Sequence, residues 1–73
     1  MRDITVRPGP GVWIVETGGE RLVYVKGSEA ERAARERARA MAASVAEAVV
    51  VRVFDLSDQP FAELVFHSTL VLS

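Results

Sequence analysis

The side chains that could carry out acid–base chemistry are few in this sequence of 73 residues, and they do not converge. His67 is the single histidine, and Glu63 stands four positions before it in a segment that alternates like a strand. A strand rises about 3.3 Å per residue, so ~13 Å separates the two side chains, too far for the carboxylate to orient the imidazole. We interpret His67 as an exposed histidine at the end of a strand.

Metal chemistry and covalent chemistry find no better support in the residue types. The chain has no cysteine, which excludes disulfide scaffolds, thiolate zinc sites, iron–sulfur clusters and cysteine nucleophiles. Asp55 and Asp58 flank a turn and could chelate calcium, but paired carboxylates in such a segment more often bond the local backbone. The glycine-rich turns neither open a helix nor precede a Lys-Ser/Thr step, so no phosphate loop is indicated. We predict no catalytic residue, no metal site, no cofactor and no enzymatic activity.

The arginines in the middle of the chain form the pattern that most resembles a binding site. At 100° per residue, Arg32, Arg35 and Arg39 lie on the side of a helix opposite its alanine stripe, where they could contact phosphates. Glutamates are interleaved, with Glu31 placed four residues before Arg35 in the favourable order. The formal net charge of −1 also supplies no broad attraction to nucleic acid. We predict an ion-paired solvent face, and nucleic-acid binding by these three arginines is the alternative.

Arg37 differs from the other arginines in its predicted position. It falls near the middle of the apolar stripe of the same helix. A charge there is costly unless the side chain extends to the surface or meets a carboxylate, so we expect one of these two arrangements.

The elements that must position these side chains follow from a change of period along the chain. Alternating β-branched residues give way to an Ala- and Arg-rich stretch with helical spacing, and alternation then returns. Ser28 and Glu31 match a capping box at the helix start, and Gly18-Gly19 matches a tight hairpin turn. We predict strands at residues 3–7, 12–16, 21–26, 49–54 and 61–67, turns at 8–11 and 55–60, and a helix from residue 30 to about residue 46.

This order predicts one α+β domain over residues 1–73, arranged βββαββ, with an antiparallel sheet and one helix packed on one face. The helix face is narrow and mostly alanine, because its stripe consists of Ala30, Ala34, Ala38, Met41 and Val45. Small side chains allow a close approach to the sheet but bury little area each. Residues 68–73 are either a strand extension or an apolar tail.

A single helix cannot cover both faces of the predicted sheet, and both faces are apolar. Whichever face carries Trp13 and Tyr24, the opposite set is apolar as well, and uncovered apolar surface usually marks an interaction site. That opposite set is Val12, Ile14, Val23 and Val25. We predict a homo-oligomer, most simply a two-fold dimer, that associates through this sheet face or through an edge strand. In the alternative, the tail at residues 70–72 folds back over that face.

Several short segments taken together resemble a known family. They are Trp13-x-Val15, Gly18-Gly19, the run Lys26–Ala30 at the start of the Ala- and Arg-rich helix, and Val49–Arg52. Over about residues 4–66 this order resembles a family of small bacterial proteins catalogued as domain of unknown function number twenty-one eighty-eight. The resemblance implies the same meander, helix and closing hairpin, and it implies no activity. This chain departs from the family at residues 55–60, where an Asp-Gly turn is expected.

The sequence therefore predicts a small bacterial module that acts by protein–protein interaction and not by catalysis. No stretch resembles a signal peptide, and no apolar run approaches the ~20 residues of a membrane-spanning helix. We expect a cytoplasmic protein with no membrane partner. The sequence does not identify a protein partner beyond a second copy of the chain.

Overall fold

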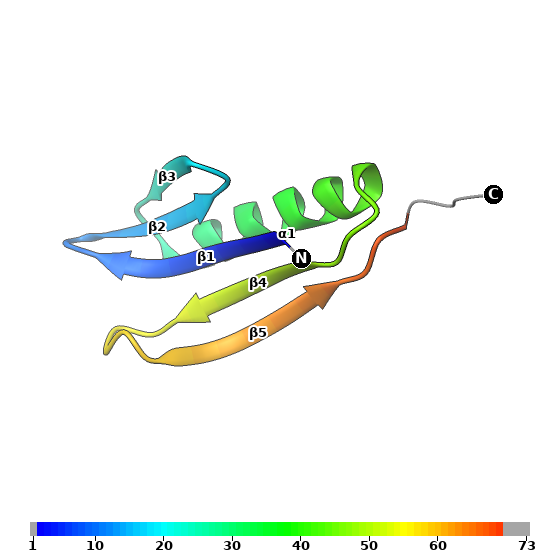
Figure 1. Ribbon diagram of the computed structural model, residues 1–73. Helices are drawn as coiled ribbons and strands as arrows, with labels where there is room; N and C mark the ends of the chain where they lie inside the picture. Colours follow the sequence, from blue (N-terminus) through cyan, green and yellow to red (C-terminus); the bar gives the residue numbers. More distant parts are fainter. Residues whose placement is uncertain (1, 70–73) are drawn as a thin grey trace.

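In the computed structural model, which describes residues 2–69, five strands form one sheet and a single helix crosses one of its faces (Figure 1). The predicted α+β class, single domain and βββαββ order are confirmed. Within the described residues, no helix is long and apolar enough to cross a membrane. The elements are β1 (Arg2–Gly9), β2 (Val12–Thr17), β3 (Glu20–Tyr24), α1 (Gly27–Ser44), β4 (Val49–Phe54) and β5 (Pro60–Phe66).

The sheet is mixed, so the prediction of an antiparallel sheet is wrong at one pairing. The strand order is β3-β2-β1-β4-β5, and β4 pairs parallel to β1 while every other pair is antiparallel. β3 runs in the same direction as β1, and α1 then carries the chain back along the sheet. The next strand therefore starts beside the beginning of β1, where Arg2 pairs with Val49.

β1 is longer than the alternation predicts, because it continues through Pro8 and Gly9. Pro8 pairs with Trp13 of β2, and the turn is confined to Pro10 and Gly11. The ladder between β1 and β4 ends at the pair of Val6 with Val53, so Pro8 and Gly9 pair with no described strand on that side. A proline is tolerated at such a free edge. The predicted turn at Gly18-Gly19 is confirmed, and both glycines have positive φ, at 51° and 88°.

The helix begins earlier than the predicted capping box allows. α1 starts at Gly27 with Lys26 as its N-cap, no side chain caps it, and Ser28 lies inside the first turn. The reason is contact with the sheet, because a Cβ at residue 27 would lie 3.0 Å from the indole of Trp13. Glycine at this position lets the first helical turn rest on the indole. The helix also ends at Ser44, two residues before the predicted end.

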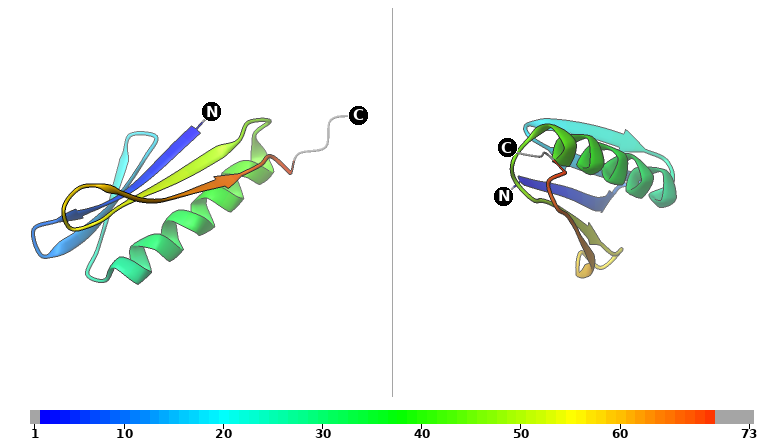
Figure 2. Two further views of the ribbon diagram at one scale, coloured as in Figure 1. Left: turned by 90° about the horizontal axis from the view of Figure 1, so that it is seen from below. Right: turned by 90° about the vertical axis from the view of Figure 1, so that its right-hand side faces the viewer.

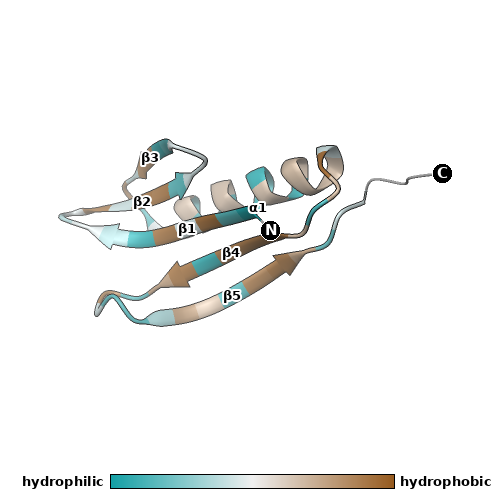
Figure 3. Cartoon of the chain, in the orientation of Figure 1, coloured by the Kyte–Doolittle hydropathy of each residue, from teal (hydrophilic) through white to brown (hydrophobic). Residues whose placement is uncertain are grey.

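A line of alanines on α1 packs against the valines of the central strands. Ala30, Ala34, Ala38 and Ala42 are buried, with Met41 partly buried beside them. Ala42 takes the place predicted for Val45, which caps the end of the helix. The opposing core residues are Ile4, Val6, Val15, Val49, Val51 and Val53. Figure 3 shows the contrast between the apolar strand β4 and the paler, partly hydrophilic helix.

Because the helix lies close to the sheet, we expect enlarging a buried alanine to be destabilising. Ala38→Leu should lower the free energy of unfolding by about 1–3 kcal/mol, since the added atoms must displace the helix or strain the core. Ala40→Leu is the matched control, because Ala40 is exposed on the same helix, and its effect should stay within roughly 0.5 kcal/mol. Urea unfolding followed by Trp13 fluorescence measures both, and equal effects would contradict the close packing.

Candidate interaction surfaces

The predicted self-association residues lie at one end of the sheet face turned away from α1. Ile14 pairs with Val23 across β2 and β3, while the neighbouring pair of Val15 and Leu22 packs on the core side. Val12 and Ile14 are half-buried, whereas Val23 is 58% exposed and Val25, directly after β3, is 78% exposed. The structure therefore leaves the β3 half of this apolar set open to solvent.

A charged band crosses the middle of the same face, so this face is not apolar throughout. The band follows the strand register from Arg21 through Glu16 and Thr5 to Arg52 and Glu63. Neighbouring side chains pair along it, with 3.6 Å between Arg21 and Glu16 and 3.2 Å between Arg52 and Glu63. Arg52 also lies 2.9 Å from Asp3. The expected apolar face is thus limited to the part beyond this band.

A cation also sits within the apolar end of the face. Arg7 of β1 lies beside Ile14 of β2 in the strand register. Its guanidinium carbon is 4.9 Å from the centroid of the Phe54 ring. The Nε atom of Arg7 is buried and has no hydrogen-bond partner among the described residues. The side chain of Arg7 and the Phe54 ring cover each other. The exposed apolar area at this end of the face is therefore smaller and lies around Val23.

The second exposed apolar region is the outer strand β5. α1 lies mainly over β1, β2 and β4, and β5 forms the outer edge of the sheet beyond β4 (Figure 2, right-hand view). On β5, Phe61 is 72% exposed, Val65 48% and Leu64 38%. The ladder with β4 shifts register at Val53 and Phe54, so Phe61 has no partner on β4. β5 therefore combines exposed apolar side chains with an edge that pairs with no other strand in residues 2–69.

The three arginines proposed for nucleic-acid contact are all exposed on α1. Arg39 turns toward β5, with its guanidinium carbon 5.9 Å from the centroid of the Phe66 ring. Arg32 and Arg35 make no ion pair with any described residue, so the expected pair of Glu31 with Arg35 is not formed. The structure does not produce the predicted ion-paired face.

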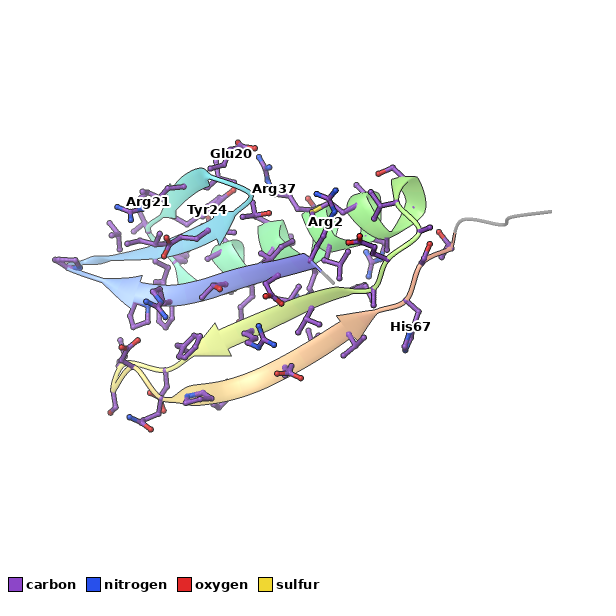
Figure 4. The ribbon with its side chains drawn as sticks, viewed as in Figure 1. Arg2, Glu20, Arg21, Tyr24, Arg37 and His67 are labelled. Atoms are coloured by element: carbon purple, nitrogen blue, oxygen red, sulfur yellow. The ribbon has the colours of Figure 1, made fainter. Side chains whose placement is uncertain are left out.

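Arg37 meets a carboxylate, which is one of the two arrangements expected for it. Its two terminal nitrogens donate to the carboxylate of Glu20 at 3.1 and 3.5 Å. Figure 4 shows the two side chains directed toward each other from α1 and β3. The side chains are 39% and 60% exposed, so the pair sits at the rim of the core and ties the helix to the β3 edge.

The remaining candidate groups lie apart and have local roles. His67 is exposed just beyond β5, and Glu63 pairs with Arg52 and not with the histidine. Asp55 organises its turn, because its Oδ1 accepts the backbone N–H groups of Ser57 at 2.9 Å and Gln59 at 3.0 Å. Across residues 2–69, no three acidic or histidine side chains cluster as a metal site would require. The predicted turn is confirmed at residues 55–59, whereas Pro60 already belongs to β5 and pairs with Phe54.

Sequence reasoning missed a hollow of about 460 Å³ between the start of α1 and the β4–β5 turn. Trp13 of β2 and Phe54 of β4 line it, together with Leu56 of the turn and Phe61 of β5. Glu31 and Ser28 lie at its helix side. The one signal in the sequence was Leu56, an apolar residue inside an otherwise polar turn, which is 82% exposed.

For residues 68–73 we predicted either an apolar tail or an extension of the last strand. Residues 70–73 fall outside the described residues, so the structure tests this prediction only at residues 68 and 69. Ser68 donates through Oγ to the carbonyl of Val45 at 2.6 Å, and the N–H of Thr69 donates to the carbonyl of Ala42 at 3.0 Å. Residues 68 and 69 therefore turn toward the end of α1 and do not extend β5.

The pair of Arg37 with Glu20 should contribute modestly and measurably to stability. Because both groups are partly exposed, we expect a coupling free energy of about 0.2–1 kcal/mol that decreases as salt is added. A double-mutant cycle with Arg37→Gln and Glu20→Gln, followed by urea unfolding, measures it. Strictly additive effects of the two substitutions would show that the contact carries no stabilisation.

Comparisons with protein-family models, with curated proteins and with solved structures each find no match to this chain. The resemblance to the bacterial family of unknown function therefore stays a prediction.

Proposed function

We propose that this chain is a small non-enzymatic module that self-associates and acts through protein–protein contact, by the uncovered sheet face or a sheet edge. The observation that carries the proposal is the set of large apolar side chains left exposed by a single helix. These are Val23, Val25, Leu56, Phe61, Leu64 and Val65. Exposed apolar side chains on open strands are typical of surfaces that pair with another chain.

The size of the core supports the same proposal. A domain of this length buries only about 60% of its unfolded surface, and without disulfides or metal its net stability is a few kcal/mol. Here alanine and valine make up most of the buried residues, with Ile4 the largest that is fully buried. Burying exposed apolar residues against a second copy would supply area that the single chain lacks. A dimer and a cytoplasmic location belong to this proposal.

The mass of the protein in solution tests self-association directly. We expect static light scattering at low micromolar concentration to give about twice the 8.0 kDa of one chain. Val23→Lys and Leu64→Lys each place a charge on one candidate surface, and Ala40→Lys is the control on the exposed side of α1. The variant that restores the mass of one chain locates the contact, whereas an unmodified chain of 8.0 kDa overturns the proposal.

Nucleic-acid binding is the second candidate, because Arg32 and Arg35 are exposed and unpaired within the described part of the chain. Two such groups on a chain of net charge −1 give a weak electrostatic footprint. Protein–protein contact is therefore the better-supported function.

We expect fluorescence anisotropy to detect no binding of single- or double-stranded oligonucleotides at micromolar protein and about 50 mM salt. Binding that weakens steeply as salt is raised, and that is lost in the Arg32→Gln/Arg35→Gln variant, would instead establish the second candidate. Arg21→Gln, on the opposite side of the sheet from α1, is the matched control.

A further inference from the structure

We propose that two copies of the chain pair antiparallel along β5, about a two-fold axis that passes beside Leu64, to form one continuous sheet. The inference rests on the self-association proposed above and names its surface and register. An antiparallel pair of edge strands satisfies the outward backbone N–H and C=O groups of both copies.

β5 is the better of the two free edges for such pairing. It has seven residues, of which Glu63 alone is charged, and Phe61, Leu64 and Val65 are exposed. β3 has five residues and begins with Glu20-Arg21. Charged side chains and short length protect a sheet edge from pairing, so β3 is protected and β5 is not.

The register of the two paired β5 strands is fixed by the residue that lies opposite the same residue of the second copy. A two-fold axis perpendicular to the sheet places one residue directly opposite itself. Centring the pair on Glu63 would set two carboxylates face to face, which is destabilising, and would draw Pro60 into the ladder although it has no N–H to donate. Centring it on Leu64 places leucine against leucine and leaves Pro60 outside.

This register also matches the other side chains of the strand. On the helix side, Ala62 of each copy faces Phe66 of the other, so a small residue meets a large one. On the opposite side, Glu63 faces Val65, and His67 lies diagonally across from Glu63. Diagonal neighbours in a sheet are about 7–8 Å apart. Figure 4 shows the His67 side chain extending beyond the end of β5, toward its free edge. Pairing would therefore bring together the two groups that a single chain holds apart.

The helices leave room for the junction. α1 lies mainly over β2, β1 and β4, so the two helices are separated by about the five strand spacings from β1 to β1 of the second copy. At about 4.8 Å each, these amount to about 24 Å, against a helix diameter of about 10–12 Å. The two helices can thus lie on the same face of the joined sheet without a clash.

The absence of native cysteine allows a direct test of the register by disulfide trapping. Leu64→Cys should form a covalent dimer under mild oxidation, because only a residue beside the axis lies within disulfide distance of its own counterpart. Glu63→Cys and Val65→Cys should each cross-link poorly alone, yet form a heterodimer when mixed. Val23→Cys, exposed on the β3 edge, is the matched control. Non-reducing electrophoresis measures the fraction of covalent dimer, and circular dichroism of each reduced variant confirms its fold.

The outcomes separate this inference from the proposal on which it rests. If the unmodified chain has twice the single-chain mass but Leu64→Cys cross-links no faster than Val23→Cys, the β5 register is wrong while self-association stands. If the mixed Glu63→Cys and Val65→Cys chains give no heterodimer, the register is likewise overturned, independently of any effect of replacing Leu64. An unmodified chain that remains single overturns both.

Discussion

The close approach of an alanine-lined helix to a valine-rich sheet is the constraint on which the rest of this structure depends. Ala30, Ala34, Ala38 and Ala42 are all buried, so along this line only small side chains of the helix meet the strands beneath it. At the start of α1, a Cβ on Gly27 would lie only 3.0 Å from the Trp13 ring, which is a tight contact. The alanines do not reach the outer strands, which α1 meets through longer side chains, Arg37 with Glu20 of β3 and Arg39 with Phe66 of β5. The helix-facing residues of β1, β2 and β4 are buried as a result, and the outer strands β3 and β5 are more exposed.

Ion pairs between neighbouring strands take the place of a second covering layer on the open face. Arg52 alone approaches two carboxylates, Asp3 and Glu63, and Arg21 approaches Glu16 on the strand beside it. Exposed pairs of this kind contribute about 0–1 kcal/mol each, so their main effect is to keep the middle of the face hydrated. On β3 and β5, the exposed apolar side chains Val23 and Val65 lie two positions from the charged residues Arg21 and Glu63 of this band. Within the described residues, the exposed apolar surface of this face therefore lies on either side of the band.

Local sequence patterns predicted the helix and strands of this fold well. The features they missed, the pairing of β4 and the start of α1, depend on contacts between elements. Alternation located all five strands, and Gly18-Gly19 located a hairpin, because backbone geometry at these positions depends on neighbouring residues alone. The parallel pairing of β4 with β1 depends on the path of the helix across the sheet. The start of α1 depends on Trp13, fourteen positions before Gly27, which overrode the local capping signal at Ser28.

The same distinction applies to the candidate surfaces. The sequence predicted that Val12, Ile14, Val23 and Val25 share a side, since strand alternation fixes this, and the structure places Ile14 and Val23 opposite each other. It did not single out the exposed edge of β5, because strand order decides which strand is outermost. Nor did it predict that Arg39 would lie over Phe66, since helical spacing gives the direction of a side chain and not the residue beneath it.

Arg39 bears on both candidate functions, nucleic-acid binding by α1 and self-association along β5. Its guanidinium lies over Phe66, so part of β5 on the helix side is covered by a cation on a flexible stem and not by an aliphatic side chain. A cover of this kind can shift aside at small cost, because cation–π contacts at exposed sites contribute roughly 0.5–1 kcal/mol. An arginine engaged with β5 is less available to phosphate, which weakens the row of three arginines as a nucleic-acid site. Leu64, two residues before Phe66, is 38% exposed, and pairing with a second chain would cover it.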